Sequence, residues 1–153
     1  MKPDPRPMVW AGLLLGAGLG GFFDGIVFHQ LLQWHNMLSA RLPPDTLLNA
    51  KINMFWDGVF HSAMWLMTLA GLWRLFEAGR SEDAAWSGRL LLGGMAAGWG
   101  SFNLVEGVID HQLLGLHHVF DGAARHAPAD LLFLASGALL LGLGLFLVRK
   151  RER

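Results

Sequence analysis

Cysteine is absent from this sequence of 153 residues, and so is tyrosine. Without cysteine the chain has no disulfide, no thiolate metal ligand, no iron–sulfur cluster and no cysteine nucleophile, and the redox compartment stays open. Without tyrosine, no phenol can serve as a radical or as an acid. An excess of charge is lacking too, because 12 basic and 12 acidic side chains balance. That balance removes the electrostatic basis for binding nucleic acid.

Motifs of several common enzyme classes are also missing. The sequence has no glycine-rich phosphate loop, no HExxH motif of zinc proteases and no Gly-x-Ser-x-Gly elbow. What is abundant is apolar: 53% of the residues are hydrophobic and the mean hydropathy is +0.38. This composition is too apolar for an ordinary soluble domain of this size and indicates a membrane protein.

Four long apolar segments predict transmembrane helices, because about 20 residues at about 1.5 Å per residue cross roughly 30 Å of hydrocarbon. We expect one integral membrane domain over residues 1–153, with spans at about 8–34, 53–76, 90–116 and 131–148. The predicted fold class is all-α, a four-transmembrane-helix bundle. Frequent glycines in three of the segments favour close helix packing in lipid. The first apolar run is too long for a signal peptide and lacks an obvious cleavage site, so we expect it to be retained.

Lysine and arginine are distributed unevenly between the two sides that alternating topology defines. The side that holds both termini carries Lys2, Arg6, Arg74, Arg80, Arg89, Arg149, Lys150, Arg151 and Arg153. The other side carries only Arg41, Lys51 and Arg125. The positive-inside rule therefore predicts a multi-pass protein with both termini in the cytoplasm.

A polar motif occurs twice in the chain. Residues 24–35 read DGIVFHQLLQWH and residues 106–117 read EGVIDHQLLGLH. The carboxylate, the glycine, both histidines, the glutamine and the Leu-Leu pair align without a gap. A shorter echo, WDGVFH, lies at 56–61. Since the first and third spans run in the same direction, the sequence predicts two parallel internal repeats around an axis along the membrane normal.

Ionisable residues of the first three spans fall at a similar depth in the outer half of the bilayer, as the constant rise per residue of a helix shows. The predicted metal site comprises Asp24, His29, Asp57, His61, Glu106, Asp110 and His111. Nearer the outer surface, either an entry site or a set of ordinary interfacial histidines is formed by His35, His117 and His118. We expect His126 in a loop.

Five residues separate Asp24 from His29, and five separate Glu106 from His111. A regular α-helix turns residues at this spacing to different faces, about 140° apart. A π-type turn brings residues i and i+5 onto one face, and such turns favour functional sites. We therefore predict a π-type turn in both motifs.

A bound metal explains why so many polar residues share one depth. An ionisable side chain inside hydrocarbon costs about 2.5–3.5 kcal/mol on insertion scales, and neighbouring carboxylates cannot all ionise there without a cation between them. Copper, iron or zinc on nitrogen and oxygen ligands meets both needs. We favour the three histidines, one from each span, as ligands, and the carboxylates as further ligands or as groups that orient the imidazoles. Hydrogen-bonded packing and a metal-free proton path stay open as alternatives.

Several functions are compatible with such a site. The first is metal handling, and the second is a metal-dependent membrane oxidoreductase or hydrolase with Glu106 or Asp57 as the general base toward a metal-bound water. A haem protein with two of His29, His61 and His111 as axial ligands is a third, against which the surrounding carboxylates argue. Proton conduction and homo-oligomer formation are also open.

The motifs at 21–35, 56–61 and 103–118 resemble a bacterial family of four-span membrane proteins catalogued as a domain of unknown function. The resemblance covers nearly the whole chain. One departure is Asn36, where the family pattern often has a second histidine after His35. The family is often associated with the copper-assembly protein of cytochrome c oxidase. The resemblance therefore implies metal handling or respiratory-oxidase maturation in the bacterial plasma (inner) membrane, with oxidase-assembly components as partners.

Overall fold

The computed structural model describes residues 3–121 and 126–149, and in this part of the chain the prediction of an all-α fold is confirmed. The helices are α1 (Arg6–Phe23), η1 (Asp24–Leu31), α2 (Leu47–Arg80), α3 (Gly88–Glu106), η2 (Gly107–Leu113) and α4 (Ala127–Arg149). Five basic residues of the predicted charge bias lie outside the described residues, namely Lys2, Arg125, Lys150, Arg151 and Arg153.

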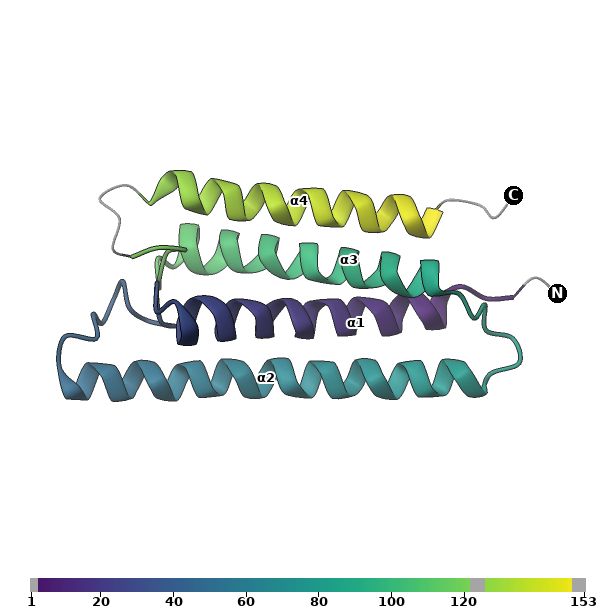
Figure 1. Cartoon of the computed structure of the whole chain (residues 1–153), viewed down its shortest axis with the longest axis horizontal. Helices are drawn as coiled ribbons and strands as arrows, with labels where there is room; N and C mark the ends of the chain where they lie inside the picture. Colours follow the sequence, from purple (N-terminus) through teal and green to yellow (C-terminus); the bar gives the residue numbers. More distant parts are fainter. Residues whose placement is uncertain (1–2, 122–125, 150–153) are drawn as a thin grey trace.

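The four long helices lie side by side in a row, in the order α4, α3, α1, α2 (Figure 1). α1 packs against α3, and each of these two packs against one outer helix, α2 or α4. In the described residues α2 and α4 make no extensive contact with each other. The row therefore does not close into the expected bundle around a shared core, because the middle of the molecule is a direct contact between two helices.

Glycines allow the backbones of α1 and α3 to touch. A Cβ atom added to Gly16 would overlap the carbonyl oxygen of Met95. A Cβ atom added to Gly98 would overlap the carbonyl oxygen of Leu13. The offset that relates the two polar motifs also relates Gly98 to Gly16 and Met95 to Leu13, so the two contacts are equivalent. Close approach through small residues is typical of helices packed in lipid, where burial of apolar surface does not drive association.

Both predicted π-type turns are confirmed as π-helical segments. η1 continues α1, and η2 continues α3. Each ends with an amide-to-carbonyl hydrogen bond across five residues, from Leu32 to Val27 and from Leu114 to Ile109, and both bonds are 2.8 Å long. Consequently the carboxylate and the histidine of each motif face the same side of their helix.

Two helices are long and apolar enough to cross a membrane, the continuous helix Arg6–Leu31 and α4. α2 and α3 are long enough but less apolar. Large apolar side chains remain exposed on the two outer helices, among them Leu132, Leu139, Phe55, Trp65 and Trp73. So much exposed apolar surface is unusual for a soluble monomer and matches contact with lipid.

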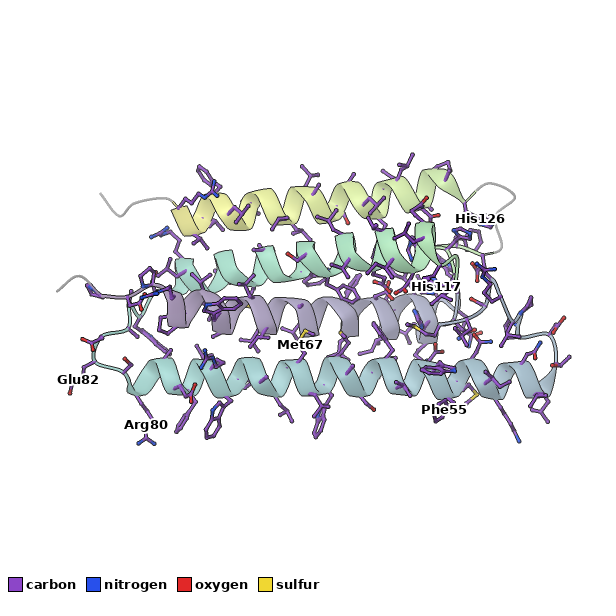
Figure 2. The ribbon with its side chains drawn as sticks, turned by 180° about the vertical axis from the view of Figure 1, so that it is seen from behind. Phe55, Met67, Arg80, Glu82, His117 and His126 are labelled. Atoms are coloured by element: carbon purple, nitrogen blue, oxygen red, sulfur yellow. The ribbon has the colours of Figure 1, made fainter. Side chains whose placement is uncertain are left out.

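The polar residues gather at one end of the row. η1, η2 and the first turns of α2 and α4 meet there, and the two termini lie at the opposite end (Figure 1). Figure 2 shows His117 and His126 at the polar end, with Arg80 and Glu82 at the other. The terminal end is held by a small apolar core of Met8, Ala78 and Leu90.

Candidate metal centre

η1 places Asp24 and His29 together at the polar end. The Nε2 atom of His29 lies 3.1 Å from Oδ2 of Asp24. The other ring nitrogen, Nδ1, donates a 3.0 Å hydrogen bond to Oδ1 of Asp57 on α2. All three side chains are buried. The imidazole thus lies between carboxylates from two helices, and its hydrogen bond goes to the carboxylate on α2.

His35 comes back to the same place because the chain reverses after η1. Gln33 has a positive φ of 52°, a conformation that few residues other than glycine adopt. The ring of His35 then lies 4.4 Å from the ring of His29, and its Nε2 lies 3.9 Å from Oδ2 of Asp24. His35 Nδ1 donates to the carbonyl oxygen of Val119 at 2.9 Å. This bond leaves the lone pair on Nε2, which faces the carboxylate.

The second motif repeats this arrangement. Gly115 has a φ of 53° and reverses the chain after η2. The Nε2 atom of His117 then lies 3.8 Å from Oε1 of Glu106, and its ring lies 4.8 Å from the ring of His111. His117 Nδ1 donates to the carbonyl oxygen of Met37 at 3.2 Å. Each motif therefore supplies one carboxylate and two imidazoles, and each is tied to the loop that follows the other.

The two motifs meet at a pair of stacked imidazoles. The rings of His35 and His117 are 4.6 Å apart and inclined by only 2°. We call the six converging residues the central cluster: Asp24, His29, His35, Glu106, His111 and His117. Three overlapping sets have one ligand atom per residue within 4.8 Å of the others, namely His29/His35/His117, Glu106/His111/His117 and Asp24/His29/Glu106.

Buried polar atoms without partners are confined to the central cluster. Within the described residues, every fully buried side-chain nitrogen or oxygen that lacks a hydrogen-bond partner is in the following set: Asp24 Oδ2, His29 Nε2, His35 Nε2, Glu106 Oε1 and Oε2, His111 Nδ1 and His117 Nε2. Leaving such atoms unpaired costs about 1–3 kcal/mol each. A cation among them would accept their lone pairs, so the residues present fit a metal ion.

The charge state of His117 also suits a metal. Burial lowers the pKa of His117 to about 2, and the neighbouring imidazoles of His35 and His111 contribute to that lowering. The ring is therefore neutral at physiological pH, which is the form that binds metal. Asp24 and Glu106 both offer a ligand oxygen to one shared group of atoms. Two carboxylates so close together repel each other unless one of them is protonated or a cation lies between them.

Asp57 orients its neighbours and does not point into the cluster. Besides the bond from His29, it accepts a 2.8 Å bond from the Met37 amide and a 2.9 Å bond from Nδ2 of Asn36. Of the two roles that the sequence left open for Asp57, the geometry favours the orienting one, which is common for carboxylates next to metal-binding histidines.

Asp130, in the first turn of α4, holds the second motif in the same way. It accepts a 3.0 Å bond from the Val119 amide and a 2.8 Å bond from His118 Nδ1, and its Oδ1 lies 3.5 Å from His111 Nδ1. Sequence reasoning missed this residue. One sequence signal could have found it. Asp130 is separated from the closely packed Gly144 by the same number of residues as Asp57 is from the closely packed Gly71.

The predicted site residues divide into two groups. Four of the seven, Asp24, His29, Glu106 and His111, lie in the central cluster. His61 lies beside it, with Nδ1 donating to the Asp57 carbonyl oxygen at 2.7 Å, and Asp110 is half-buried without a ligand atom in the converging sets. The residues expected nearer the surface also divide. His35 and His117 are central, whereas His118 is bonded to Asp130 at the edge.

A comparison with known families matches residues 11–151 to a family model described as "Predicted membrane protein (DUF2243)". The match covers most of the chain and confirms the resemblance seen in the motifs. Comparison with curated proteins and with solved structures gives no match. The family description names the membrane and no activity.

Proposed function

We propose that this protein, which belongs to the DUF2243 family of predicted membrane proteins, binds a transition metal in its central cluster and serves metal handling. The observation that carries the proposal is the confinement of all unpartnered buried side-chain nitrogen and oxygen atoms in the described residues to that cluster. Imidazole and carboxylate ligands without sulfur suit copper(II), iron or zinc. Six ligating groups exceed the four that a tetrahedral ion takes, and they could supply three protein ligands to each of two ions with water in the fourth position.

All four long helices span the membrane in this proposal. α3 lies between α1 and α4, the two helices whose length and composition suit a span. α2 extends alongside α1 and exposes large apolar side chains. Because the basic residues favour cytoplasmic termini, the central cluster at the opposite end faces outward. A metal ion outside the cytoplasm would then reach it without crossing the bilayer.

The two motifs belong to parallel internal repeats in this proposal. Support comes from features that recur at the offset between the motifs: the glycine crossing of α1 and α3, the two π-helical segments, and the exchanged bonds of His35 and His117. An axis along the helices relates parallel repeats of this kind. Each repeat would bring an equal share of ligands, two imidazoles and one carboxylate.

Maturation of a respiratory oxidase is the form of metal handling that we propose. It rests on the family resemblance, which links such proteins to copper assembly, and on the outward position of the cluster. Oxidase-assembly components in the bacterial plasma membrane would then be partners. A homo-oligomer is compatible with the row of helices, because a row leaves both of its broad faces open to lipid or to a second copy (Figure 1).

A metal-dependent membrane oxidoreductase or hydrolase is the second candidate. One observation favours it: both carboxylate oxygens of Glu106 are buried and unpartnered, so this group could accept a proton from a metal-bound water. Asp57 is less suited to that role, because its oxygens already accept three hydrogen bonds.

Metal analysis of the full chain, purified in detergent from cells grown with copper, iron and zinc, tests the proposal. We expect one or two equivalents of one of these metals per chain, lost in the double variant H35A/H117A. The exposed substitution Glu82→Gln, at the far end of the molecule, serves as the control (Figure 2). A stoichiometric Soret band would point to haem instead. A folded wild-type chain without any metal would overturn the proposal.

A further inference from the structure

The orientation of the rings in the central cluster decides which imidazoles can share one metal ion. An imidazole binds a metal through a nitrogen lone pair that lies in the plane of its ring, so an ion with two imidazole ligands lies where their planes cross. The rings of His35 and His117 are stacked 4.6 Å apart and inclined by only 2°, so their planes do not cross within the cluster. Distance alone would let both rings join His29 around one ion, but their orientation assigns them to different ions.

The two imidazoles of the first motif are oriented to share an ion. The rings of His29 and His35 are 4.4 Å apart and inclined by 71°. Oδ2 of Asp24 lies 3.1 Å from Nε2 of His29 and 3.9 Å from Nε2 of His35. Ligand atoms around a tetrahedral ion with bonds of about 2.0–2.1 Å lie about 3.3–3.4 Å apart. The three atoms are close to this spacing, so the first motif forms a site with three protein ligands.

The second motif forms an equivalent site. The rings of His111 and His117 are 4.8 Å apart and inclined by 73°. Both residues converge with Glu106, whose Oε1 lies 3.8 Å from Nε2 of His117. The inclined pairs that link the two motifs are farther apart, at 5.7 Å for His29 with His117 and 6.4 Å for His35 with His111. The closest inclined pairs therefore lie within a motif, and each motif has its own site.

The buried charges of the polar end match two divalent ions. Within the described residues the buried acidic side chains are Asp24, Asp57, Glu106 and Asp130, and no lysine or arginine is buried. Asp57 and Asp130 accept hydrogen bonds on both oxygens, as ionised carboxylates do. With neutral imidazoles, two divalent ions balance all four carboxylates, whereas one ion would leave two carboxylates to be neutralised by protons. Each half supplies two of the four, so the balance holds in each half separately.

Glu106 lies between the two sites. It converges with the imidazoles of the second motif and also with Asp24 and His29 of the first. Both of its carboxylate oxygens are buried and unpartnered, whereas Asp24 has only Oδ2 in that state. A carboxylate can bind a different metal ion with each oxygen. Glu106 is therefore the group that can join the two sites.

We propose that the central cluster is a dinuclear centre, with one divalent transition-metal ion in each motif and the carboxylate of Glu106 as a bridge between them. The ligands of the first ion are Asp24, His29 and His35, and those of the second are Glu106, His111 and His117. The bridge completes the coordination of the first ion, and water completes that of the second. This inference rests on the proposed function, to which it adds a second ion and the division of the ligands.

Loading of the full chain with Cu²⁺ in detergent tests the proposal, because electron paramagnetic resonance distinguishes an isolated Cu²⁺ ion from a coupled pair. We expect the wild type to bind two equivalents, with most of the bound copper lacking the signal of an isolated ion. His35→Ala should lose the first ion and His117→Ala the second, so each should keep one equivalent with the full isolated signal. Asp24→Asn keeps the shape of the side chain and should behave like His35→Ala. Glu82→Gln is the control, and thermal unfolding shows that each variant is folded.

The amount of bound copper separates this proposal from the proposed function. A folded wild type that binds no metal refutes both. One equivalent in the wild type, lost alike in His35→Ala and in His117→Ala, supports a metal centre and refutes the pair of ions. Two equivalents that show the full signal of isolated ions refute the bridge through Glu106, and the dinuclear centre with it.

Discussion

The two halves of the chain build the central cluster with the same contacts and yet differ directly beside it. Against Gly25 in η1 lies His61 of α2, whereas against Gly107 in η2 lies Leu134 of α4. Likewise an amide stands at Asn36 where the second half has His118. In the described part of the chain, every unpartnered buried side-chain atom belongs to a group that the two halves share, and none belongs to a group in which they differ. The comparison separates the residues that form the central cluster, which both halves supply, from the neighbouring residues, which differ between the halves.

Exchange of one imidazole in each half is expected to have the largest effect. His35→Ala and His117→Ala should each lower metal affinity by more than about 100-fold, beyond the range for groups that only orient a ligand. Equilibrium dialysis with metal analysis measures both. If only one of the two variants loses metal, the halves are not equivalent and the site belongs to one of them.

Alanine at the helix crossing should cost stability equally in both halves. In Gly16→Ala or Gly98→Ala the new methyl group meets a backbone carbonyl, which cannot move aside, so α1 and α3 must separate. We expect a loss of about 1–3 kcal/mol, as for other overpacked cores, measured as thermal unfolding in detergent. Gly142→Ala is the control, because nothing lies within 4 Å of its added Cβ. A smaller loss in one crossing variant than in this control would show that the backbones do not touch there.

Substitution of either orienting carboxylate should lower metal affinity to a similar extent. Asp57→Asn and Asp130→Asn remove a charge next to an imidazole and keep the shape of the side chain. Each is expected to lower metal affinity by about 10–100-fold, as such substitutions do at other metal sites. Titration with Co²⁺ compares the two, with Glu82→Gln as the control. Unchanged affinity in Asp130→Asn would remove this residue from the support of the cluster.

The smallest effect is expected where the halves differ. His61→Leu gives α2 the residue that α4 has at Leu134, so packing against Gly25 is preserved. Metal affinity should be nearly unchanged, because His61 offers no ligand atom to the converging sets. Loss of one metal equivalent would instead make His61 a ligand, as the sequence suggested.

The local parts of this structure could be predicted from the sequence. The helices follow from long apolar runs, and the two π-helical segments follow from the five-residue spacing of Asp24 to His29 and of Glu106 to His111. These signals lie within one helix, where the relation of position to face is fixed by geometry. Four members of the central cluster were found in this way.

The other parts depend on contacts that no single segment encodes. His35 and His117 were expected nearer the surface because the helices were extended straight, whereas reversals at Gln33 and Gly115 turn both rings inward. A positive φ at a glutamine has no sequence signature. Asp130 was missed because the sequences of α2 and α4 do not resemble each other. A helix that faces lipid needs only apolar side chains, so the two helices share few residues that would show that Asp130 is the equivalent of Asp57. The arrangement of the helices in a row likewise could not be predicted from the number of spans, because it depends on which pairs of helices pack against each other.

Asp130 also makes the proposed metal centre dependent on α4. This helix follows all six converging residues in the chain, yet Asp130 holds Val119 and His118 and lies next to His111. A chain cut before α4 would keep all six converging residues but lack the carboxylate that supports the end of the second motif. We therefore expect the proposed centre to reach its full metal affinity only after α4 has packed against α3.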